Sequence, residues 1–386
     1  MAALANFASL TPSQQEQLLN SPALQPPPGV QPNFYDPPNA NNIVYPTIIL
    51  ALLLSFLSIL LRIHGRWYCM KTVKIQDAMG IVAFFLFVAE LSIYLEQIRQ
   101  PNARGLFVHQ WNIQVRDLRP FFLRQLIISN LYSGMMLLLK TAILIDWLQT
   151  FSPPGDRGAF YWACILAIIA NELLWIIALV LVNAACVPYA AIYDKTIPGH
   201  CFDNHELRNV IVGIFNFIID VMILVLPQRV IWKLRMSTMK RLGLSFVFAV
   251  GILTCVSALV RLIFTITSLH ADDITYAYSA VGLWTVAEIT CGFIVFSVIA
   301  TSKSFASFKR GKIISRFRSQ QNSTIGGPSG HQSPSTRWKF VRSISAKSND
   351  YSEIERQNFT SLELSTFGET IGIPTVPLAR ARNSPL

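Results

Sequence analysis

Six ionisable side chains lie inside long apolar runs of this chain, where charges are costly. They are four acids and two bases: Glu90, Lys140, Glu172, Asp220, Arg261 and Glu288. A charge inside a bilayer is strongly unfavourable unless it pairs with an opposite charge or meets water. Such residues can form a proton relay, act as general acids, or make structural ion pairs. We expect structural ion pairs here and no catalytic residue.

The positions of these charges along their runs sort them into two depths. With a helical rise of about 1.5 Å per residue, the depth of each residue follows from its place in the run. The outer half then holds Glu90, Glu172 and Arg261, and the middle to inner half holds Lys140, Asp220 and Glu288. We therefore expect Arg261 to pair with an acid of the outer layer and Lys140 with an acid of the inner layer.

The apolar runs that hold the charges are long enough to cross a membrane. The 386 residues are 52% hydrophobic and only 14% charged, whereas soluble domains have about 25% charged residues. The expected spans are 43–63, 77–96, 120–148, 159–183, 208–232, 242–269 and 275–300. Buried helices of a soluble core are the alternative, but they are usually shorter and amphipathic. The sequence predicts an all-α, multi-pass integral membrane protein with seven helices in the lipid bilayer of the plasma membrane or an endomembrane.

Basic residues beside the spans predict the orientation of the chain. The first loop, the fifth loop and the stretch after the last span are rich in Lys and Arg. Such residues favour the cytoplasmic side. By contrast, the only charges of the N-terminal segment are Glu16 and Asp36, and the sixth loop carries Asp272 and Asp273. We therefore expect the N-terminus outside and the C-terminus in the cytoplasm, although the arginines of the second loop break the pattern.

The composition divides the chain into three parts. Residues 1–42 are rich in Pro, Gln and Asn and are expected to form a disordered extracytoplasmic N-terminus. Residues 43–305 form the seven-span domain, and residues 306–386 a basic, disordered cytoplasmic tail. Residues 301–386 hold 13 Lys and Arg against 5 Asp and Glu, a net charge of +8. We expect this tail to bind the anionic inner leaflet or a cytoplasmic partner. No folded basic face is expected, so the sequence does not indicate binding to nucleic acid.

Two cysteines lie in the fourth loop, which the expected orientation places outside. Cys186 and Cys201 are 15 residues apart, and oxidation is allowed on that side of the membrane. We predict a disulfide within the loop, with two unpaired thiols as the alternative.

Neither a metal site nor a retinal chromophore is expected. A metal site needs about three ligands at one depth, and none of the six histidines lies inside a span. Retinal needs a lysine for its Schiff base, normally in the last span, and residues 275–300 contain none. We therefore expect no cofactor.

From the fifth span onward the sequence resembles a known family. The residues that carry the likeness are Asp220, Leu226, Pro227, Trp232, Leu234, Met236, Lys240, Gly243, Phe248, Gly251 and Arg261. Their order and spacing are similar to the fungal rhodopsin-like integral membrane domain. This is a family of receptor-like fungal seven-span proteins that includes a membrane protein of the satratoxin biosynthetic cluster.

Further matches extend the resemblance over residues 43–305. They are Arg62, Arg66, Asp77, Gly105, His109, Tyr132, Lys140, Cys186, Pro188, Cys201, Trp284 and Glu288. The stretch from Gly105 to His109 looks like the Gly-Leu-Gly-x-His element of the family, with Phe107 in place of its second glycine.

The resemblance implies a receptor-like fold and no chromophore. Some family members are proposed as surface sensors, and others are encoded in secondary-metabolite gene clusters. Asp146-Trp147-Leu148 stands where animal receptors have Asp-Arg-Tyr, so their usual mechanism of G-protein coupling is not supported. We expect a non-enzymatic, receptor-like or accessory membrane protein of a mycotoxin or similar cluster, with an unknown small-molecule ligand. A transporter of a small metabolite, or a membrane-embedded cyclase that uses a buried carboxylate, is the alternative.

Overall fold

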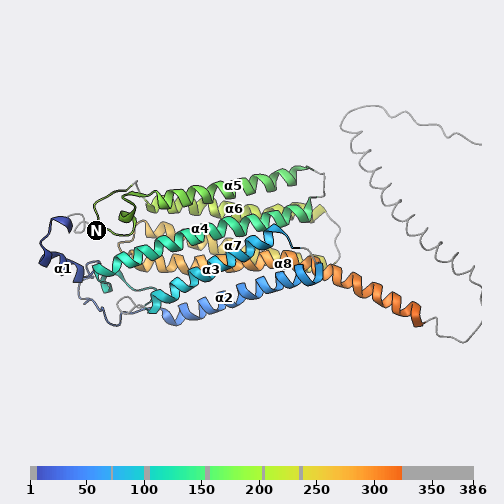
Figure 1. Cartoon of the computed structure of the whole chain (residues 1–386), viewed down its shortest axis with the longest axis horizontal. Coiled ribbons are helices and arrows are strands. Elements are labelled where there is room, and N and C mark those ends of the chain that lie inside the picture. Colours follow the sequence, from blue (N-terminus) through green and yellow to red (C-terminus); the bar gives the residue numbers. More distant parts are fainter. Residues whose placement is uncertain are drawn as a thin grey trace, which may run out of the picture. The chain divides into compact units, whose positions relative to one another are not determined.

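Seven long helices dominate the computed structural model, which describes residues 7–70, 73–99, 105–152, 157–201, 205–233 and 238–323. They are α2 (Asn41–Ile63), α3 (Ile75–Arg99), α4 (Val115–Phe151), α5 (Ala159–Asn183), α6 (His205–Lys233), α7 (Thr238–Ser268) and α8 (Ile274–Ser323). Each is long and apolar enough to cross a membrane. Figure 1 shows them side by side, so the predicted all-α, seven-span fold is confirmed.

The outward faces of the helices are apolar, as a lipid environment requires. On α5, Leu166, Ile169, Leu173, Ile176 and Val180 are exposed at spacings of three or four residues, which place them on one face. A soluble protein would not expose a stripe of this kind. The chain is therefore a multi-pass integral membrane protein.

The centre of the bundle lies around α4 and α8, the two most enclosed spans. Phe87, Met135, Phe293 and Phe296 are fully or almost fully buried there. Gly80 allows α3 to approach α8 closely, because a Cβ atom at this position would lie 2.2 Å from the Phe296 ring.

The N-terminal segment contains ordered structure, which differs from the expected disordered segment. Phe7–Ser9 form the 3-10 turn η2, and Pro12–Asn20 form helix α1, which contacts α4. Ala23 donates a backbone hydrogen bond to Ile113 over 2.8 Å, and Ala40 one to Leu106 over 3.2 Å. The composition did not show these partners, because they lie far away in the sequence.

One end of the bundle carries most of the ordered loops. There the 3-10 turn η4 (Gln110–Asn112), strand β1 (Cys186–Val187), the 3-10 turn η5 (Tyr189–Ile192) and strand β2 (His200–Cys201) connect the helices. The strands are antiparallel, with Cys186 opposite Cys201. We call this end the disulfide end. The opposite end contains the π-helix η3 (His64–Met70), and which end faces the cytoplasm stays a prediction.

The chain divides into two units, Met1–Ile314 and Ser315–Leu386. Helix α8 continues to Ser323, so residues 306–323 are helical where a disordered tail was expected. The rest of the predicted tail, residues 324–386, lies outside the described residues.

Candidate functional site

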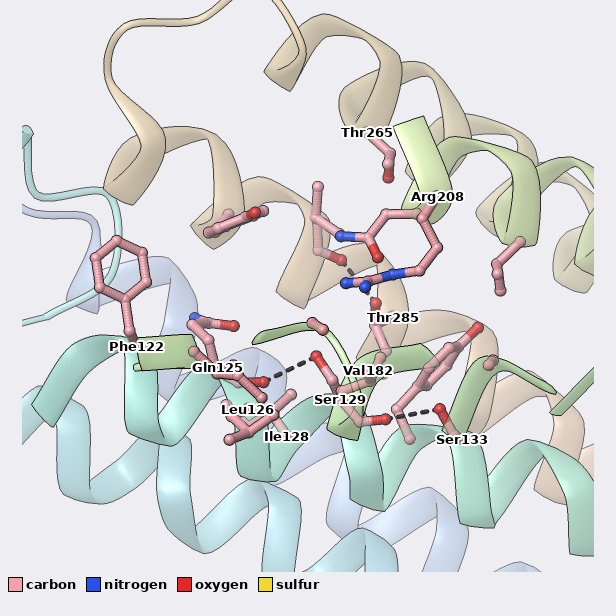
Figure 2. Close-up of a pocket in the computed structure, with 18 of the residues that line it drawn as sticks. Phe122, Gln125, Leu126, Ile128, Ser129, Ser133, Val182, Arg208, Thr265 and Thr285 are labelled. Carbon is pink, nitrogen blue, oxygen red and sulfur yellow. Dashed lines mark hydrogen bonds between the residues drawn. The ribbon is translucent and has the colours of Figure 1, made fainter. Parts of the chain in front are cut away.

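A cavity of about 420 Å³ opens inside the bundle near the disulfide end. Its wall is mainly apolar and aromatic and includes Trp175. Phe122 and Leu126 also line it, and Ser129 and Thr285 add hydroxyl groups (Figure 2). Cavities of this size, with a mainly apolar wall and a few polar groups, typically hold drug-sized molecules. The cavity is therefore the first candidate for a functional site.

One face of α4 forms a long side of the cavity. Phe122, Leu126, Ser129 and Ser133 follow one another at spacings of three or four residues, which a helix brings to a single face. The two serine hydroxyls donate to backbone carbonyls of their own helix, over 2.8 Å each. These bonds leave the lone pairs of the hydroxyl oxygens as acceptors for a bound molecule.

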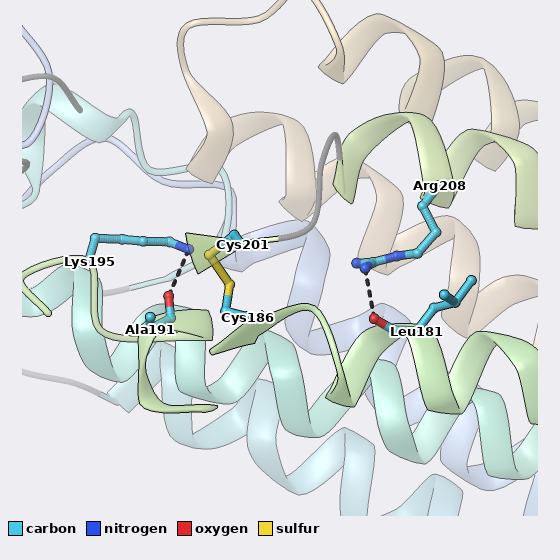
Figure 3. Close-up of a disulfide and its surroundings, with 6 residues drawn as sticks. All are labelled: Leu181, Cys186, Ala191, Lys195, Cys201 and Arg208. Atoms are coloured by element: carbon cyan, nitrogen blue, oxygen red, sulfur yellow. Dashed lines mark hydrogen bonds between the residues drawn. A yellow bond between two sulfur atoms is a disulfide. The ribbon is translucent and has the colours of Figure 1, made fainter. Parts of the chain in front are cut away.

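The hairpin of β1 and β2 borders the cavity and is closed by the predicted disulfide. Cys186 and Cys201 are bonded and both line the cavity (Figure 3). This confirms the predicted pairing. The bond fixes the loop between α5 and α6 beside the cavity.

Two cations line the cavity near this disulfide. Lys195 donates to the backbone carbonyl of Ala191 over 3.2 Å, and Arg208 donates to that of Leu181 over 3.0 Å (Figure 3). Burial lowers the pKa of Lys195, because the ammonium group loses part of its hydration. Neither residue was predicted from the sequence to have a role.

The deeper end of the cavity is formed by Arg261 and Tyr132. The guanidinium carbon of Arg261 lies 5.3 Å from the centre of the Tyr132 ring, within the range of a cation–π contact. The Nε atom of Arg261 donates to Glu288 over 2.8 Å, while its buried Nη2 has no hydrogen-bond partner among the described residues.

Beneath Arg261 lies a connected network of buried charges. Lys140 Nζ is 2.7 Å from Asp220 Oδ1 and 3.9 Å from Glu288 Oε1. Asn216 accepts a bond from Lys140 over 2.7 Å and donates to Glu288 over 2.8 Å. With Arg261 the network contains two bases and two acids, so its formal charge is zero. Mutual pairing is what makes such charges tolerable in a membrane.

The expected pairing of Arg261 with an outer acid is wrong. Arg261 bonds Glu288, from the inner layer, because depth along a span does not determine which helices face each other in the bundle. Glu90 is fully buried in α3 with no base within ion-pair distance among the described residues. Glu172 is half-buried and accepts a hydrogen bond from Thr141. The expected pairing of Lys140 with Asp220 or Glu288 agrees with the structure.

A second, smaller cavity of about 50 Å³ lies on the other side of the network. Lys140, Asp220 and Glu288 line it together with Trp147 and Pro227. Arg261 lines only the larger cavity. The Arg261–Glu288 bond therefore separates the two spaces.

A second charged cluster lies towards the opposite end, and the sequence did not predict it. Arg62 contacts Asp77 and Asp146 at 2.7 Å each, and Arg66 contacts Asp146 at 2.6 Å. Arg62 also donates to the carbonyl of Phe296 over 2.6 Å. Arg62 and Arg66 were expected among the basic residues of the first loop, yet their side chains are only 2% and 3% exposed. The acids at Asp77 and Asp146 were the available signal.

Two residues of the family loop element explain its local shape. Gly105 has a φ of 116° and Phe107 a φ of 62°. Glycine is favoured in this left-handed region, so the glycine that the family has at the second position fits the conformation better than Phe107. The Phe107 ring contacts Tyr276, with 5.3 Å between the ring centres.

The other motif residues have different surroundings. His109 stacks between Trp111 and Tyr276, and its Nδ1 lies 2.6 Å from Asp273 Oδ2. Trp284 is half-buried one turn before Glu288 in α8. Trp232 lies in α6 beyond the residues whose side chains the structure describes. In the described ranges, no three His, Cys, Asp or Glu side chains are grouped to hold a metal ion, and the absence of a metal stays a prediction.

Comparison with known proteins gives the family. The model of the fungal rhodopsin domain matches residues 61–307, which contain the charge network and all the residues that line the larger cavity. The chain belongs to the fungal rhodopsin domain family. No solved structure gives a significant match.

Three named fungal proteins are similar in sequence to this chain. "Fugralins biosynthesis cluster protein 2" of Gibberella zeae is 37% identical over 283 residues, which cover 72% of this chain and 69% of the relative. "SAT4 family membrane protein" of Emericella nidulans is 28% identical, over 58% of this chain and 57% of the relative. "Wortmanamides biosynthesis cluster protein C" of Talaromyces wortmannii is 25% identical, over 54% and 59%. Two of the three names thus refer to biosynthesis clusters.

Proposed function

We propose that this fungal rhodopsin domain protein is a non-enzymatic, receptor-like or accessory component of a secondary-metabolite cluster, and that it binds a small metabolite in its larger cavity. The observation that carries the proposal is the 420 Å³ space lined by apolar, aromatic and hydroxyl side chains. The names of two relatives support the link to a biosynthesis cluster.

The placement of the acids supports binding rather than catalysis. Among the described residues that line the larger cavity there is no Asp or Glu. Asp220 and Glu288 are engaged by Lys140 and Arg261. A cyclase would need a carboxylic acid that can reach its substrate and release a proton, and neither of these two acids lines the larger cavity.

A transporter is the second candidate, and one observation favours it. The larger and smaller cavities lie on the two sides of the Arg261–Glu288 bond. Breaking that bond is the step by which the two spaces would become connected. Ion pairs inside a membrane are a recurrent feature of such pathways.

One experiment in the fungus that encodes the protein tests these functions. The strains carry the wild-type gene, a deletion, Ser129→Trp, which fills the cavity, or Ile127→Trp. Ile127 is exposed on the same helix and does not line the cavity. Transcripts of neighbouring biosynthetic genes are measured together with metabolites in mycelium and medium.

Each function gives its own result. A receptor-like or accessory role predicts that the deletion and Ser129→Trp lower the whole product set, while Ile127→Trp behaves as wild type. A transporter predicts an unchanged total with more product retained in the mycelium. Build-up of one precursor with loss of its product would show that the protein is an enzyme and contradict the proposal.

A further inference from the structure

The charged side chains around the larger cavity all have the same sign. Lys195, Arg208 and Arg261 line it, and no acid does so among the described residues. Glu288 accepts a hydrogen bond from Arg261 and compensates its positive charge. The other two cations have no ion pair in the part of the chain that the structure describes, and the cavity therefore has an excess of positive charge.

Arg208 is the cation with the largest unsatisfied bonding capacity. Its Nη1 atom donates a hydrogen bond to the Leu181 carbonyl, whereas its buried Nε atom has no hydrogen-bond partner among the described residues. In Figure 2, the side chain extends from α6 into the cavity that Ser129 and Thr285 also line. A buried guanidinium N–H without an acceptor is unfavourable, because it has lost its hydrogen bonds to water. An acceptor that arrives with a ligand would remove this penalty.

Lys195 and Arg261 add donors at two other places on the wall. Lys195 bonds one carbonyl, although an ammonium group has three N–H donors. Asp194, its neighbour in sequence, is 3.2 Å from Arg119 instead. Arg261 is 7% exposed, and its buried Nη2 atom has no hydrogen-bond partner in the part of the chain that the structure describes. Donors on three elements thus face a space in which the other surfaces are mainly apolar.

We infer that the cavity takes an amphipathic molecule with an apolar or aromatic body and one anionic group such as a carboxylate. Arg208 is the main residue that binds the anion, because a guanidinium group can donate two parallel bonds to a carboxylate. Lys195 adds a second positive charge. The aromatic side chains Phe122, Tyr132 and Trp175 contact the body of the ligand. This inference rests on the proposed small-molecule function.

The test compares two probes that differ only in charge. The full-length protein is placed in phosphatidylcholine nanodiscs and titrated with 1-pyrenebutyrate or with the neutral 1-pyrenebutanol. Pyrene emission is excited by energy transfer from tryptophan, and Trp175 lies in the cavity wall. Empty nanodiscs give the partitioning of each probe into lipid. The dissociation constants are compared at neutral pH, where the carboxylate is ionised.

Variants assign the difference to particular cations. Arg208→Gln and Lys195→Gln each remove one positive charge from the lining. Arg116→Gln is the matched control, because Arg116 is exposed near the same end of the bundle and does not line the cavity. We expect the wild type to bind the carboxylate about tenfold more tightly than the alcohol, as for one charge-assisted hydrogen bond. Arg208→Gln should remove most of this difference without weakening the alcohol, and Arg116→Gln should leave it intact.

Three results would overturn the inference in different ways. Equal affinity for the two probes in the wild type would mean that water satisfies the cations, while the binding function would stand. Binding of neither probe would contradict the proposed function as well. Loss of pyrenebutyrate binding in discs that contain phosphatidylglycerol would assign the cavity to an anionic bilayer lipid instead of a metabolite.

Discussion

Arg261 Nε donates a hydrogen bond to Glu288 Oε2 over 2.8 Å, at the boundary between a cavity of about 420 Å³ and one of about 50 Å³. Arg261 comes from α7 and Glu288 from α8. The bond therefore ties together two helices and closes the deeper end of the larger cavity. Glu288 also joins Arg261 to Lys140 and Asp220 through Asn216.

Arg261→Met should sharply lower the amount and the melting temperature of folded protein. Removing one partner of a buried ion pair typically costs about 3–5 kcal/mol, because the other charge is stranded. Adding Glu288→Gln should restore part of the loss, whereas adding Glu90→Gln should not. Melting followed by size-exclusion chromatography in detergent measures both. If Glu90→Gln restored the stability of Arg261→Met and Glu288→Gln did not, the result would support the pairing expected from the sequence and contradict the structure.

Asp146→Asn should destabilise the protein at the other charged cluster. The substitution removes the carboxylate that contacts both Arg62 and Arg66, and a loss of about 3–5 kcal/mol is expected for buried charges. Glu96→Gln is the control, since Glu96 is 62% exposed where it lies 3.8 Å from Arg124. Exposed ion pairs contribute about 0–1 kcal/mol to the free energy of unfolding. Equal melting temperatures for the two variants would contradict a stabilising role of the buried cluster.

Joint replacement of Cys186 and Cys201 by Ala should reduce stability by about 3 kcal/mol, the value expected for closing a loop of this length. A reducing agent should have the same effect on the wild type and none on the variant. Cys255→Ala serves as the control, because this cysteine is free and only partly buried. Melting with and without reductant measures the change. Recovery of both thiols free from native membranes would contradict the bond.

The expected orientation of the chain in the membrane can also be tested. An epitope after Leu386 should be protected from antibody in intact cells, and engineered glycosylation sites in residues 1–42 should be used. Both follow from the basic residues of the fifth loop and the stretch after the last span. A disulfide in the fourth loop fits this orientation, because the loop then faces an oxidising compartment. Labelling of the epitope without permeabilisation would invert the topology.

The sequence predicted the seven helices well, because membrane spans depend on local composition. It also predicted the pairing of Cys186 with Cys201, since only these two cysteines share the fourth loop. Long-range contacts were harder to predict. Depth along a span predicted that Arg261 pairs with Glu90 or Glu172, but in the folded bundle Arg261 pairs with Glu288.

Residues whose role depends on packing were missed for the same reason. Asn216 lies one turn before Asp220, and this i, i+4 spacing of polar residues in an apolar run was the available signal. Arg62 and Arg66 were taken as loop residues because acids on α3 and α4 neutralise them only in the folded bundle. Lys195 and Arg208 lie in loop or helix-end sequence that looks ordinary until the cavity brings them together.

The most direct test of the account is whether a small molecule occupies the larger cavity in the protein from its own host. Full-length wild type, Ser129→Trp and Ile127→Trp are purified in parallel and denatured, and the released small molecules are compared by mass spectrometry. The account predicts one amphipathic acid that is released from the wild type and Ile127→Trp and is absent from Ser129→Trp. The same set of molecules from all three folded proteins would contradict it.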